Sequence, residues 1–290
     1  MKIIVTGSQG FLGRHVADHL GRADHEIVGI DKSPPSGAAG WAQVSADLAQ
    51  FASALELIRD ADAVVHLAAI PRPIGHTAGD VFHTNVATTF NVVEAARLAR
   101  IPRLVYVSSI SVLGYPFGQP FVPPKALPVD ENSPIHAQDA YGLSKWLGEE
   151  IIEAAVRQGG LSAVSLRMPW VQSPETFAAQ VGPRRNSTEA VRDLWSYIDA
   201  RDAAHGIGLA LGWRGDGHLR VYLAAADTYL EEETAAALAR ALPSVPLLRA
   251  LPGFSGLIDT AKARQELGFT AQHSWRDYST KEKLDPEQKN

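Results

Sequence analysis

The sequence contains no cysteine. This absence excludes disulfides, thiolate zinc sites, iron–sulfur clusters and a cysteine nucleophile. No uninterrupted apolar run approaches the roughly 18 residues of a membrane span. The short apolar run after Met1 ends at Gly7 and lacks the long apolar region and cleavage site of a signal peptide. The sequence therefore predicts a cytoplasmic protein without a membrane partner.

Basic residues are not in excess. Lys and Arg number 27 against 32 Asp and Glu, which gives a formal net charge of −5. The sequence therefore does not predict a nucleic-acid partner, because there is no strong excess of basic residues to neutralise phosphates. The 290 residues, with 46% hydrophobic and 20% charged side chains, have a globular composition and predict one or two domains.

Short apolar runs alternate with segments of helical spacing through the first 168 residues. The predicted strands are 2–6, 26–30, 41–46, 63–66, 103–107 and 161–166. The predicted helices are 11–20, closed by Gly21, then 51–59, 81–100 and 141–157. Residues 116–134 hold six prolines and predict a loop. The alternation is typical of an α/β protein with a Rossmann-like, doubly wound parallel sheet and helices on both faces.

The pattern changes after Pro169. Residues 173–187 predict irregular structure, 188–199 and 201–212 predict helices, and 219–223 predicts a strand. Further helices are expected over 230–242 and from Asp259. We therefore expect a Rossmann domain over 1–168 and a small C-terminal region over 169–279. That region should mainly bind substrate, with some segments returning to the Rossmann domain, and 280–290 should form a flexible tail.

The segment Thr6–Gly13 follows a strand and opens a helix. Its glycines Gly7, Gly10 and Gly13 allow a tight turn and a close approach of a pyrophosphate to the N–H groups of the helix N-terminus. Asp31 ends the next strand, where its carboxylate can accept hydrogen bonds from a ribose diol and repel a 2′-phosphate. The pattern favours NAD over NADP, although Lys32 could instead offer a cation.

Two further strand ends carry candidate cofactor contacts. Asp47, followed by Leu48, could accept from an adenine amine or could cap the next helix. The small residues after His66 would let a cofactor lie against the strand end, and they are Leu67, Ala68 and Ala69. His66 itself is expected to be a core histidine. No spacing of His and carboxylates predicts a metal site.

The candidate chemistry lies at Tyr141 and Lys145. Their separation by four residues places both on one face of a helix, and a nearby ammonium favours the phenolate, so Lys145 should lower the pKa of Tyr141. Tyr141 could then exchange a proton with a hydroxyl or carbonyl. Ser109, just past a strand, could hold the substrate oxygen. Ser108 or Ser111 could take that role instead, and each could also be a strand-end cap.

The chain resembles the extended short-chain dehydrogenases/reductases, the NAD-dependent epimerase/dehydratase group. The residues that carry the resemblance are Thr6–Gly13, Asp31, Asp47–Leu48, His66–Ala69, Asn85–Val86, Tyr106–Ser109, Val112–Gly114, Tyr141–Lys145 and Leu166–Arg167. It implies a catalytic triad of Ser109, Tyr141 and Lys145. It implies NAD contacts from Gly7, Gly10, Phe11, Leu12, Gly13, Asp31, Asp47, Leu48, Leu67, Ala68, Ala69, Tyr141, Lys145 and Pro169. It also implies a homodimer formed through the helices 81–100 and 141–157, where Trp146, Leu147 and Ile151 could serve the dimer or the core.

Departures from the family pattern concern the substrate. Nucleotide-sugar members usually carry Asn where this chain has Trp170, and the substrate segment is short. The length and the stretch Trp195–Asp199 are similar to uronate-dehydrogenase-like members, although Ile110 and Trp170 replace expected polar residues. Arg184, Arg185 or Arg192 could clamp a carboxylate, or each could be a solvated surface arginine.

Three functions are compatible with these residues. The first is an NAD-dependent oxidoreductase that transfers hydride between nicotinamide and a secondary alcohol or carbonyl of a small sugar, sugar acid or polyol. The second is a sugar or nucleotide-sugar epimerase or dehydratase with the same Ser/Tyr/Lys residues. The third is a non-catalytic dinucleotide-binding sensor, which would have no need of a proton relay.

Overall fold

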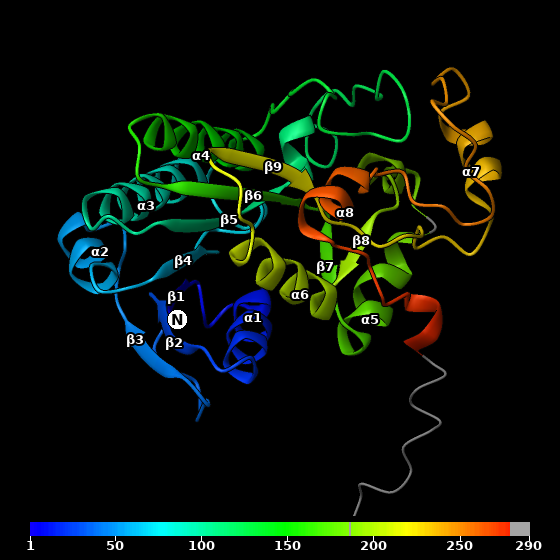
Figure 1. Cartoon of the computed structure of the whole chain (residues 1–290). Coiled ribbons are helices and arrows are strands. Elements are labelled where there is room, and N and C mark those ends of the chain that lie inside the picture. Colours follow the sequence, from blue (N-terminus) through cyan, green and yellow to red (C-terminus); the bar gives the residue numbers. More distant parts are fainter. Residues whose placement is uncertain (186, 279–290) are drawn as a thin grey trace, which may run out of the picture.

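A parallel seven-stranded sheet forms the centre of the protein (Figure 1). The computed structural model describes residues 1–185 and 187–278. The strand order is β3-β2-β1-β4-β5-β6-β9, and every neighbouring pair is parallel. The strands are β1 (Lys2–Thr6), β2 (Glu26–Asp31), β3 (Ala42–Ser45), β4 (Ala63–His66), β5 (Arg103–Ser109), β6 (Ser162–Met168) and β9 (His218–Tyr222). The predicted doubly wound sheet is confirmed.

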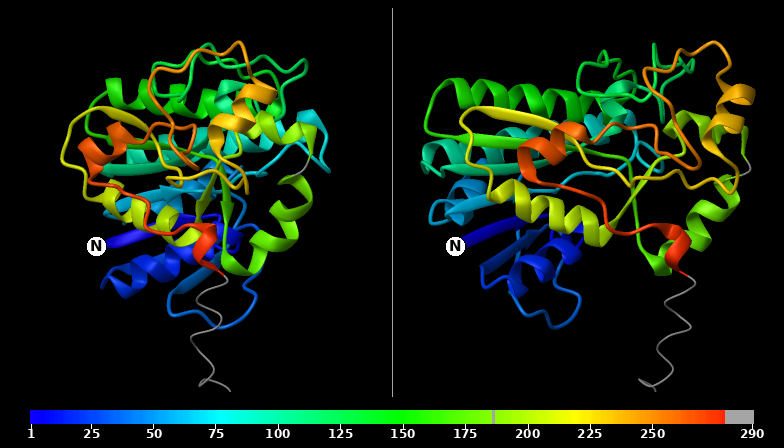
Figure 2. Two further views of the ribbon diagram at one scale, coloured as in Figure 1. Left: turned by 90° about the vertical axis from the view of Figure 1, so that its right-hand side faces the viewer. Right: turned by 45° about the vertical axis from the view of Figure 1, so that its right-hand side comes forward.

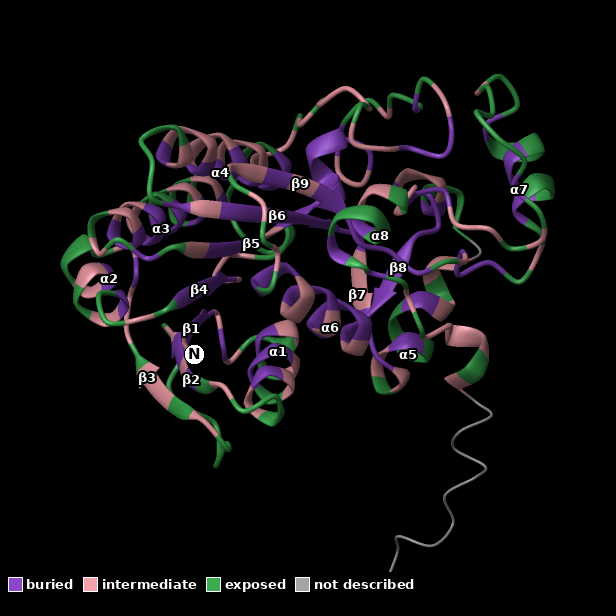
Figure 3. Ribbon diagram, viewed as in Figure 1, coloured by how far each residue is buried: buried purple, intermediate pink, exposed green. Residues whose placement is uncertain are grey.

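Helices cover both faces of this sheet (Figures 1 and 2). On one face, α1 (Phe11–Arg22) packs against α6 (Ala200–Leu211). On the other face, α2 (Phe51–Ile58), α3 (Ala78–Leu98) and α4 (Ala140–Arg157) lie side by side. Successive side chains of a strand point to opposite faces, so Ile3 and Val5 join the core under α1 and α6, while Ile4 joins the core under α2 and α3. The central strands therefore bury apolar side chains on both faces of the sheet (Figure 3).

A second lobe lies beyond the carboxyl ends of the strands and is built around the parallel pair β7 (Trp170–Gln172) and β8 (Tyr197–Asp199). It includes α5 (Pro174–Arg185), the 3₁₀ helix η2 (Thr188–Asp193) and α7 (Thr234–Ala241). Its core combines aliphatic side chains with buried aromatic rings, which belong to Tyr115, Phe177, Trp195, Tyr197, Tyr222 and Tyr229.

Several sequence predictions of helices and loops are wrong, most of them in this lobe. Residues 173–187 were expected to be irregular, but α5 occupies most of them, because a proline such as Pro174 is well suited to the first helical position. The helix expected over 188–199 is the short η2 followed by β8. In the Rossmann part, Gly21 does not end its helix, since α1 continues to Arg22.

The C-terminal half returns to the main sheet. β9 pairs with β6, and α8 (Ala261–Leu267) contacts β9 and α6. Asp202 on α6 then holds the segment that follows, because its Oδ2 accepts the N–H groups of Gln272 (3.0 Å) and His273 (2.9 Å). The division of the chain at residue 168 stays a prediction, and the tail expected over 280–290 lies outside the described residues. Across the described residues, no helix has the length and hydropathy that a membrane span requires.

Candidate active site

The glycine segment forms a tight turn between β1 and α1. Gly7 has φ +71°, and a Cβ on it would lie 2.8 Å from the Ala68 nitrogen. A Cβ on Gly13 would lie 2.0 Å from the Gly7 carbonyl oxygen, so neither position tolerates a side chain. Gly10 caps α1 without any side chain, which keeps the helix N-terminus open to an anion. Leu12 packs on the core, whereas Phe11 is exposed. This cradle fits a dinucleotide pyrophosphate.

Asp31 is held in place at the end of β2. Its Oδ2 accepts the Gln9 N–H and its Oδ1 accepts the Ser33 N–H, both at 2.9 Å. The carboxylate is thereby oriented beside the glycine turn, as a ribose contact requires. Lys32 pairs with Asp47 at 3.1 Å, so its charge is already matched by a carboxylate.

Asp47 and Leu48 follow β3. A hydrogen bond from the Ala49 N–H and one from Lys32 lower the pKa of Asp47. Asp47 does not cap α2, because Gln50 occupies the N-cap position. Leu48 is buried in the core beneath α2 and α3, so only its backbone could face a cofactor.

Thr6 and His66 fix the strand end that carries Leu67–Ala69. Thr6 Oγ1 accepts the N–H groups of Leu67 (3.2 Å) and Ala68 (3.1 Å) and lies 2.7 Å from His66 Nδ1. Thr6 must therefore donate its proton to Nδ1, which leaves the proton of the imidazole on Nε2, 3.1 Å from Thr89 Oγ1. Burial lowers the pKa of His66 to about 3. His66 is a neutral core histidine, as the sequence predicted.

This burial predicts a pH dependence of stability. The pKa of His66 is 6.5 without burial and about 3 in the folded chain, so the unfolded state binds more protons between these values. Stability should be complete above the upper value and fall toward the lower one, by about 1.4 kcal/mol per pH unit. Urea unfolding at several pH values in this window would measure the slope.

The matched control is His66→Gln, which stays neutral at every pH. Its stability should lack this part of the slope, even though its absolute stability is lower. His218, whose pKa burial lowers to about 4, contributes in the same window but does so in both proteins. Equal slopes in the two proteins would contradict the prediction.

The three candidate catalytic side chains meet where β5 ends against α4. Asp139 caps α4, and its Oδ1 accepts the N–H groups of Tyr141 and Gly142, both at 2.9 Å. Ser109 lies close enough to the Tyr141 hydroxyl to lower its pKa, and the Ser109 Oγ donates to Ser111 Oγ at 3.1 Å. Ser108 points to the opposite face of the strand, where its Oγ donates to Glu149 at 2.6 Å. Of the two neighbouring serines, only Ser109 therefore faces the tyrosine.

Burial dominates the ionisation of both α4 side chains. It raises the pKa of Tyr141 to about 12; the nearby Ser109 hydroxyl partly offsets this and the Asp139 carboxylate adds to it. Burial lowers the pKa of Lys145 to about 7, against the opposing effect of Glu149. The expectation that Lys145 lowers the pKa of Tyr141 is therefore wrong for the chain by itself. Lys145 Nζ instead donates to the Val107 carbonyl at 2.8 Å and lies 5.8 Å from the Tyr141 ring centroid.

The surroundings of Lys145 include residues for which the sequence predicted no role. Its Nζ lies 5.0 Å from the centroid of the buried Tyr106 ring. A Cβ on Gly148 would lie 2.3 Å from the Tyr106 hydroxyl, so this glycine makes room for the ring. Glu149, fully buried, forms an ion pair with Arg167 at 2.8 Å and another with Arg220 at 3.2 Å. The four-residue spacing from Lys145 to Glu149 was the available signal.

The residues expected near the substrate differ in how far they are buried. Pro169 is buried between β6 and β7, and Trp170 is half-buried against the core of the second lobe. Ile110 is buried in the same core. The edge of the Phe117 ring meets the Tyr141 ring at 84°, with centroids 6.2 Å apart. Phe117 lies in the proline-rich loop and was missed because nothing local indicates this contact.

The three candidate carboxylate clamps already have acidic partners. Arg184 pairs with Asp193 at 2.6 Å, Arg185 pairs with Glu231, and Arg192 pairs with Glu189 at 2.5 Å. Arg185 also lies over the Trp275 ring, 4.2 Å from its centroid. Each of these guanidinium groups would have to leave its acidic partner before it could bind a substrate carboxylate.

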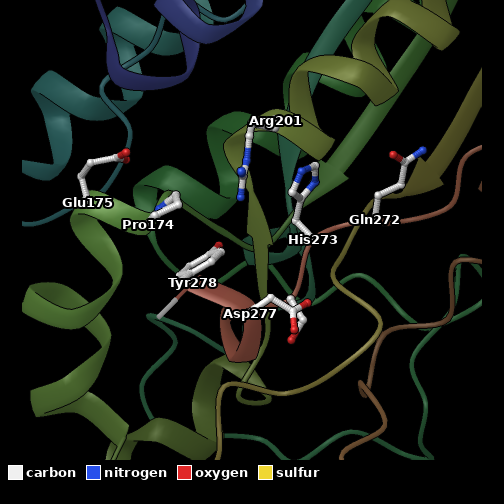
Figure 4. A pocket seen from close by; sticks show the side chains of 8 residues that line it. Pro174, Glu175, Arg201, Gln272, His273, Asp277 and Tyr278 are labelled. Atoms are coloured by element: carbon white, nitrogen blue, oxygen red, sulfur yellow. The ribbon is translucent and has the colours of Figure 1, made fainter. Parts of the chain in front are cut away.

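A cavity of about 240 Å³, lined mostly by polar residues, lies apart from this site, between α5, α6 and the C-terminal segment (Figure 4). Arg201 and His273 point into it, but Arg201 is bound to both oxygens of Asp199, at 2.9 and 2.6 Å. None of its lining residues is a predicted catalytic or cofactor residue. Within the described residues, no group of His, Asp and Glu side chains could hold a metal ion.

A family model described as the NAD dependent epimerase/dehydratase family matches residues 3–222, most of the chain. The chain belongs to this family. It is therefore an NAD(P)-dependent enzyme of the short-chain dehydrogenase/reductase superfamily, and the predicted family and NAD cofactor are confirmed.

Relatives of this family member include dehydrogenases of free sugars. The L-arabinose 1-dehydrogenase (NAD(P)(+)) of Haloferax volcanii is 30% identical over 200 residues, which cover 67% of this chain and 76% of that protein. The uronate dehydrogenase of Pseudomonas putida is 26% identical over 224 residues, 76% of this chain and 75% of that one. A short-chain dehydrogenase/reductase superfamily protein from Agrobacterium tumefaciens, solved with bound NAD, is 25% identical with a TM-score of 0.76, and the match covers 100% of both chains.

Proposed function

We propose that the protein is an NAD-dependent oxidoreductase that interconverts a secondary alcohol and a carbonyl on a small sugar, sugar acid or polyol. One observation carries this proposal. Ser109, Tyr141 and Lys145 lie together at the carboxyl ends of the strands, where the glycine cradle and Asp31 also lie. The free-sugar dehydrogenases among the relatives support the substrate class.

In the proposed mechanism, Gly7, Gly10, Phe11, Leu12 and Gly13 bind the pyrophosphate region, and Asp31 binds the adenosine ribose. Asp47, Leu48, Leu67, Ala68, Ala69 and Pro169 contact the rest of the dinucleotide, mainly through backbone atoms. NAD held by these residues would supply the hydride-transfer chemistry. Lys145 binds the nicotinamide ribose.

The proton chemistry belongs to α4 and β5. Ser109 Oγ holds the substrate oxygen, and Tyr141 Oη accepts the hydroxyl proton during oxidation or returns it during reduction. Because burial raises the pKa of Tyr141 to about 12, oxidation requires positive charge beside the phenol. A protonated Lys145, whose Nζ lies 5.8 Å from the Tyr141 ring centroid, would supply such charge from the chain itself.

The test is incubation of the protein with NAD and a panel of free aldoses, uronates, polyols and nucleotide sugars. We expect NADH absorbance to rise with one of the first three classes, with products checked by chromatography. Isomerised sugar without net NADH would replace the oxidoreductase by an epimerase. NAD binding without turnover of any compound would favour a sensor.

We also propose a homodimer in which α3 and α4 of each copy pack together. These helices contact each other along the outer face of the sheet, and α3 exposes Phe90 and Leu98 there, 52% and 49% exposed. Trp146 and Ile151 on α4 instead pack against the cores of their own chain. The cytoplasmic location stays a prediction from the sequence, as does the lack of nucleic-acid and membrane partners.

The dimer predicts that Phe90→Asp gives a monomer in light scattering, because a carboxylate buried in the interface would lack a partner. The control is Leu248→Asp, which places the same charge on a loop residue that is 66% exposed. Loss of the dimer in both variants, or in neither, would count against the α3 face.

A further inference from the structure

Residues 114–121 form a tightly folded loop, hereafter the 114–121 loop. Gly114 has φ +78°, and a Cβ on it would lie 2.1 Å from the His136 carbonyl oxygen. The Gly118 N–H donates to the Gly114 carbonyl at 3.1 Å, and a Cβ on Gly118 would lie 2.1 Å from that same oxygen. Glycine at both ends therefore lets the chain close a turn that no side chain would permit.

The closed turn presents aromatic side chains. Phe117 meets the Tyr141 ring edge to face, with centroids 6.2 Å apart. On the same loop, Tyr115 and Phe121 form a second edge-to-face pair at 6.4 Å. Phe117 remains partly exposed, whereas Tyr115 is buried. The residue beside the proposed proton acceptor is thus apolar and open on one side.

Arg192 holds this turn from a distant part of the chain. Its Nη1 donates to the Gly118 carbonyl at 2.7 Å, and its guanidinium lies 5.5 Å from the centroid of the Phe121 ring. Its Nε pairs with Glu189 at 2.5 Å, and the side chain is only 13% exposed. A carbonyl, an aromatic face and a carboxylate thus occupy the guanidinium, which leaves little of it to recognise a substrate carboxylate.

We propose that Arg192 is a positioning residue that holds the 114–121 loop, and that it thereby fixes Phe117 as an apolar wall beside Tyr141. Such a wall suits the C–H face of a sugar or polyol, since small-molecule sites combine apolar and aromatic walls with a few polar groups. The anchoring of the loop by Arg192 is independent of the proposed function, whereas the role of Phe117 as a wall of the substrate site rests on it.

The anchor is tested without substrate, by hydrogen exchange of the whole protein read by mass spectrometry. In Arg192→Met, exchange should speed up in peptides that cover residues 114–121, which include the Gly118 N–H bonded across the turn. Peptides from α1 and α3 should stay as in the native protein. Arg249→Met is the control, because Arg249 is 52% exposed and its ion pair is with Asp259, at 3.5 Å, not with the 114–121 loop.

Unchanged exchange in the loop would overturn the anchor, and so would exchange that rises around η2 alone. If Arg192→Met does not fold, Arg192→Lys serves the same comparison. A lysine keeps the charge but loses the planar fork, so the loop should still exchange faster than in the native protein.

The wall is tested on an aldose and the uronate of the same sugar. Arg192→Met should lower kcat/KM for both by a similar factor, about 10- to 100-fold, because a displaced wall misplaces either substrate. A selective loss with the uronate would overturn the proposal and make Arg192 a carboxylate site. No turnover of any compound by the native protein would reject the proposed function and the wall with it, while the exchange experiment still decides the anchor.

Discussion

Replacement of Tyr141 by phenylalanine is expected to lower kcat by about 100- to 10,000-fold, the usual contribution of a positioned proton-transfer group. The substitution removes one oxygen and keeps the ring that meets Phe117. Since the buried ring and its contact with Phe117 are kept, the site should otherwise retain its shape. Initial rates with the substrate found in the panel, followed by NADH absorbance, measure the effect.

Two controls separate this chemical role from a structural one. NAD affinity, measured by calorimetry, should stay within a few-fold of the native value, and the melting temperature should change little. Phe117→Leu, which alters the neighbouring ring but leaves the phenol, should mainly affect KM. Full activity in Tyr141→Phe would show that the tyrosine does not transfer the proton, and the catalytic site would then have to be sought elsewhere.

Replacement of Glu149 by glutamine is expected to lower the free energy of unfolding by about 3–5 kcal/mol, as for other broken buried ion pairs. Glu149 is fully buried and receives Arg167 Nε at 3.0 Å, Arg167 Nη2 at 2.8 Å and Ser108 Oγ at 2.6 Å. The glutamine leaves the buried Arg167 without a counter-charge. Urea unfolding followed by circular dichroism measures the loss.

The neighbouring Glu150 provides the matched control. It lies on the same helix and pairs with Arg220 at 3.2 Å, but its side chain is 42% exposed. Glu150→Gln should therefore cost less than about 1 kcal/mol. Similar losses in the two variants would show that burial does not decide the strength of this network. Because Glu149 opposes the lowering of the Lys145 pKa, Glu149→Gln should also bring that pKa further down.

The features that the sequence predicted best depend on neighbours along the chain. A glycine turn between a strand and a helix, an acidic residue at the next strand end, and Tyr141 one helical turn from Lys145 are all written within short segments. Strand alternation also explains why Ser109, and not Ser108, faces the tyrosine, although choosing between them required the strand register.

Other features depend on contacts between distant segments and left no local pattern. Arg192 reaches Gly118, 74 residues earlier in the chain, so its surroundings could not be inferred from its neighbours. The ionisation of Tyr141 and Lys145 is likewise not encoded in their spacing, because burial by other segments outweighs the effect of one side chain on the other. In the second lobe, Pro174 and Pro183 favour an irregular segment by their local preferences, yet α5 contains both prolines.

The order of strands has a consequence for synthesis of the chain. The two neighbouring strands β6 and β9 are separated in sequence by β7, α5, β8 and α6. Until Tyr222 has left the ribosome, β6 presents an unpaired edge, with the row of open N–H and C=O groups that invites pairing with another chain. While the second lobe is being made, this edge of the nascent sheet is therefore open to pairing with another chain, until β9 covers it.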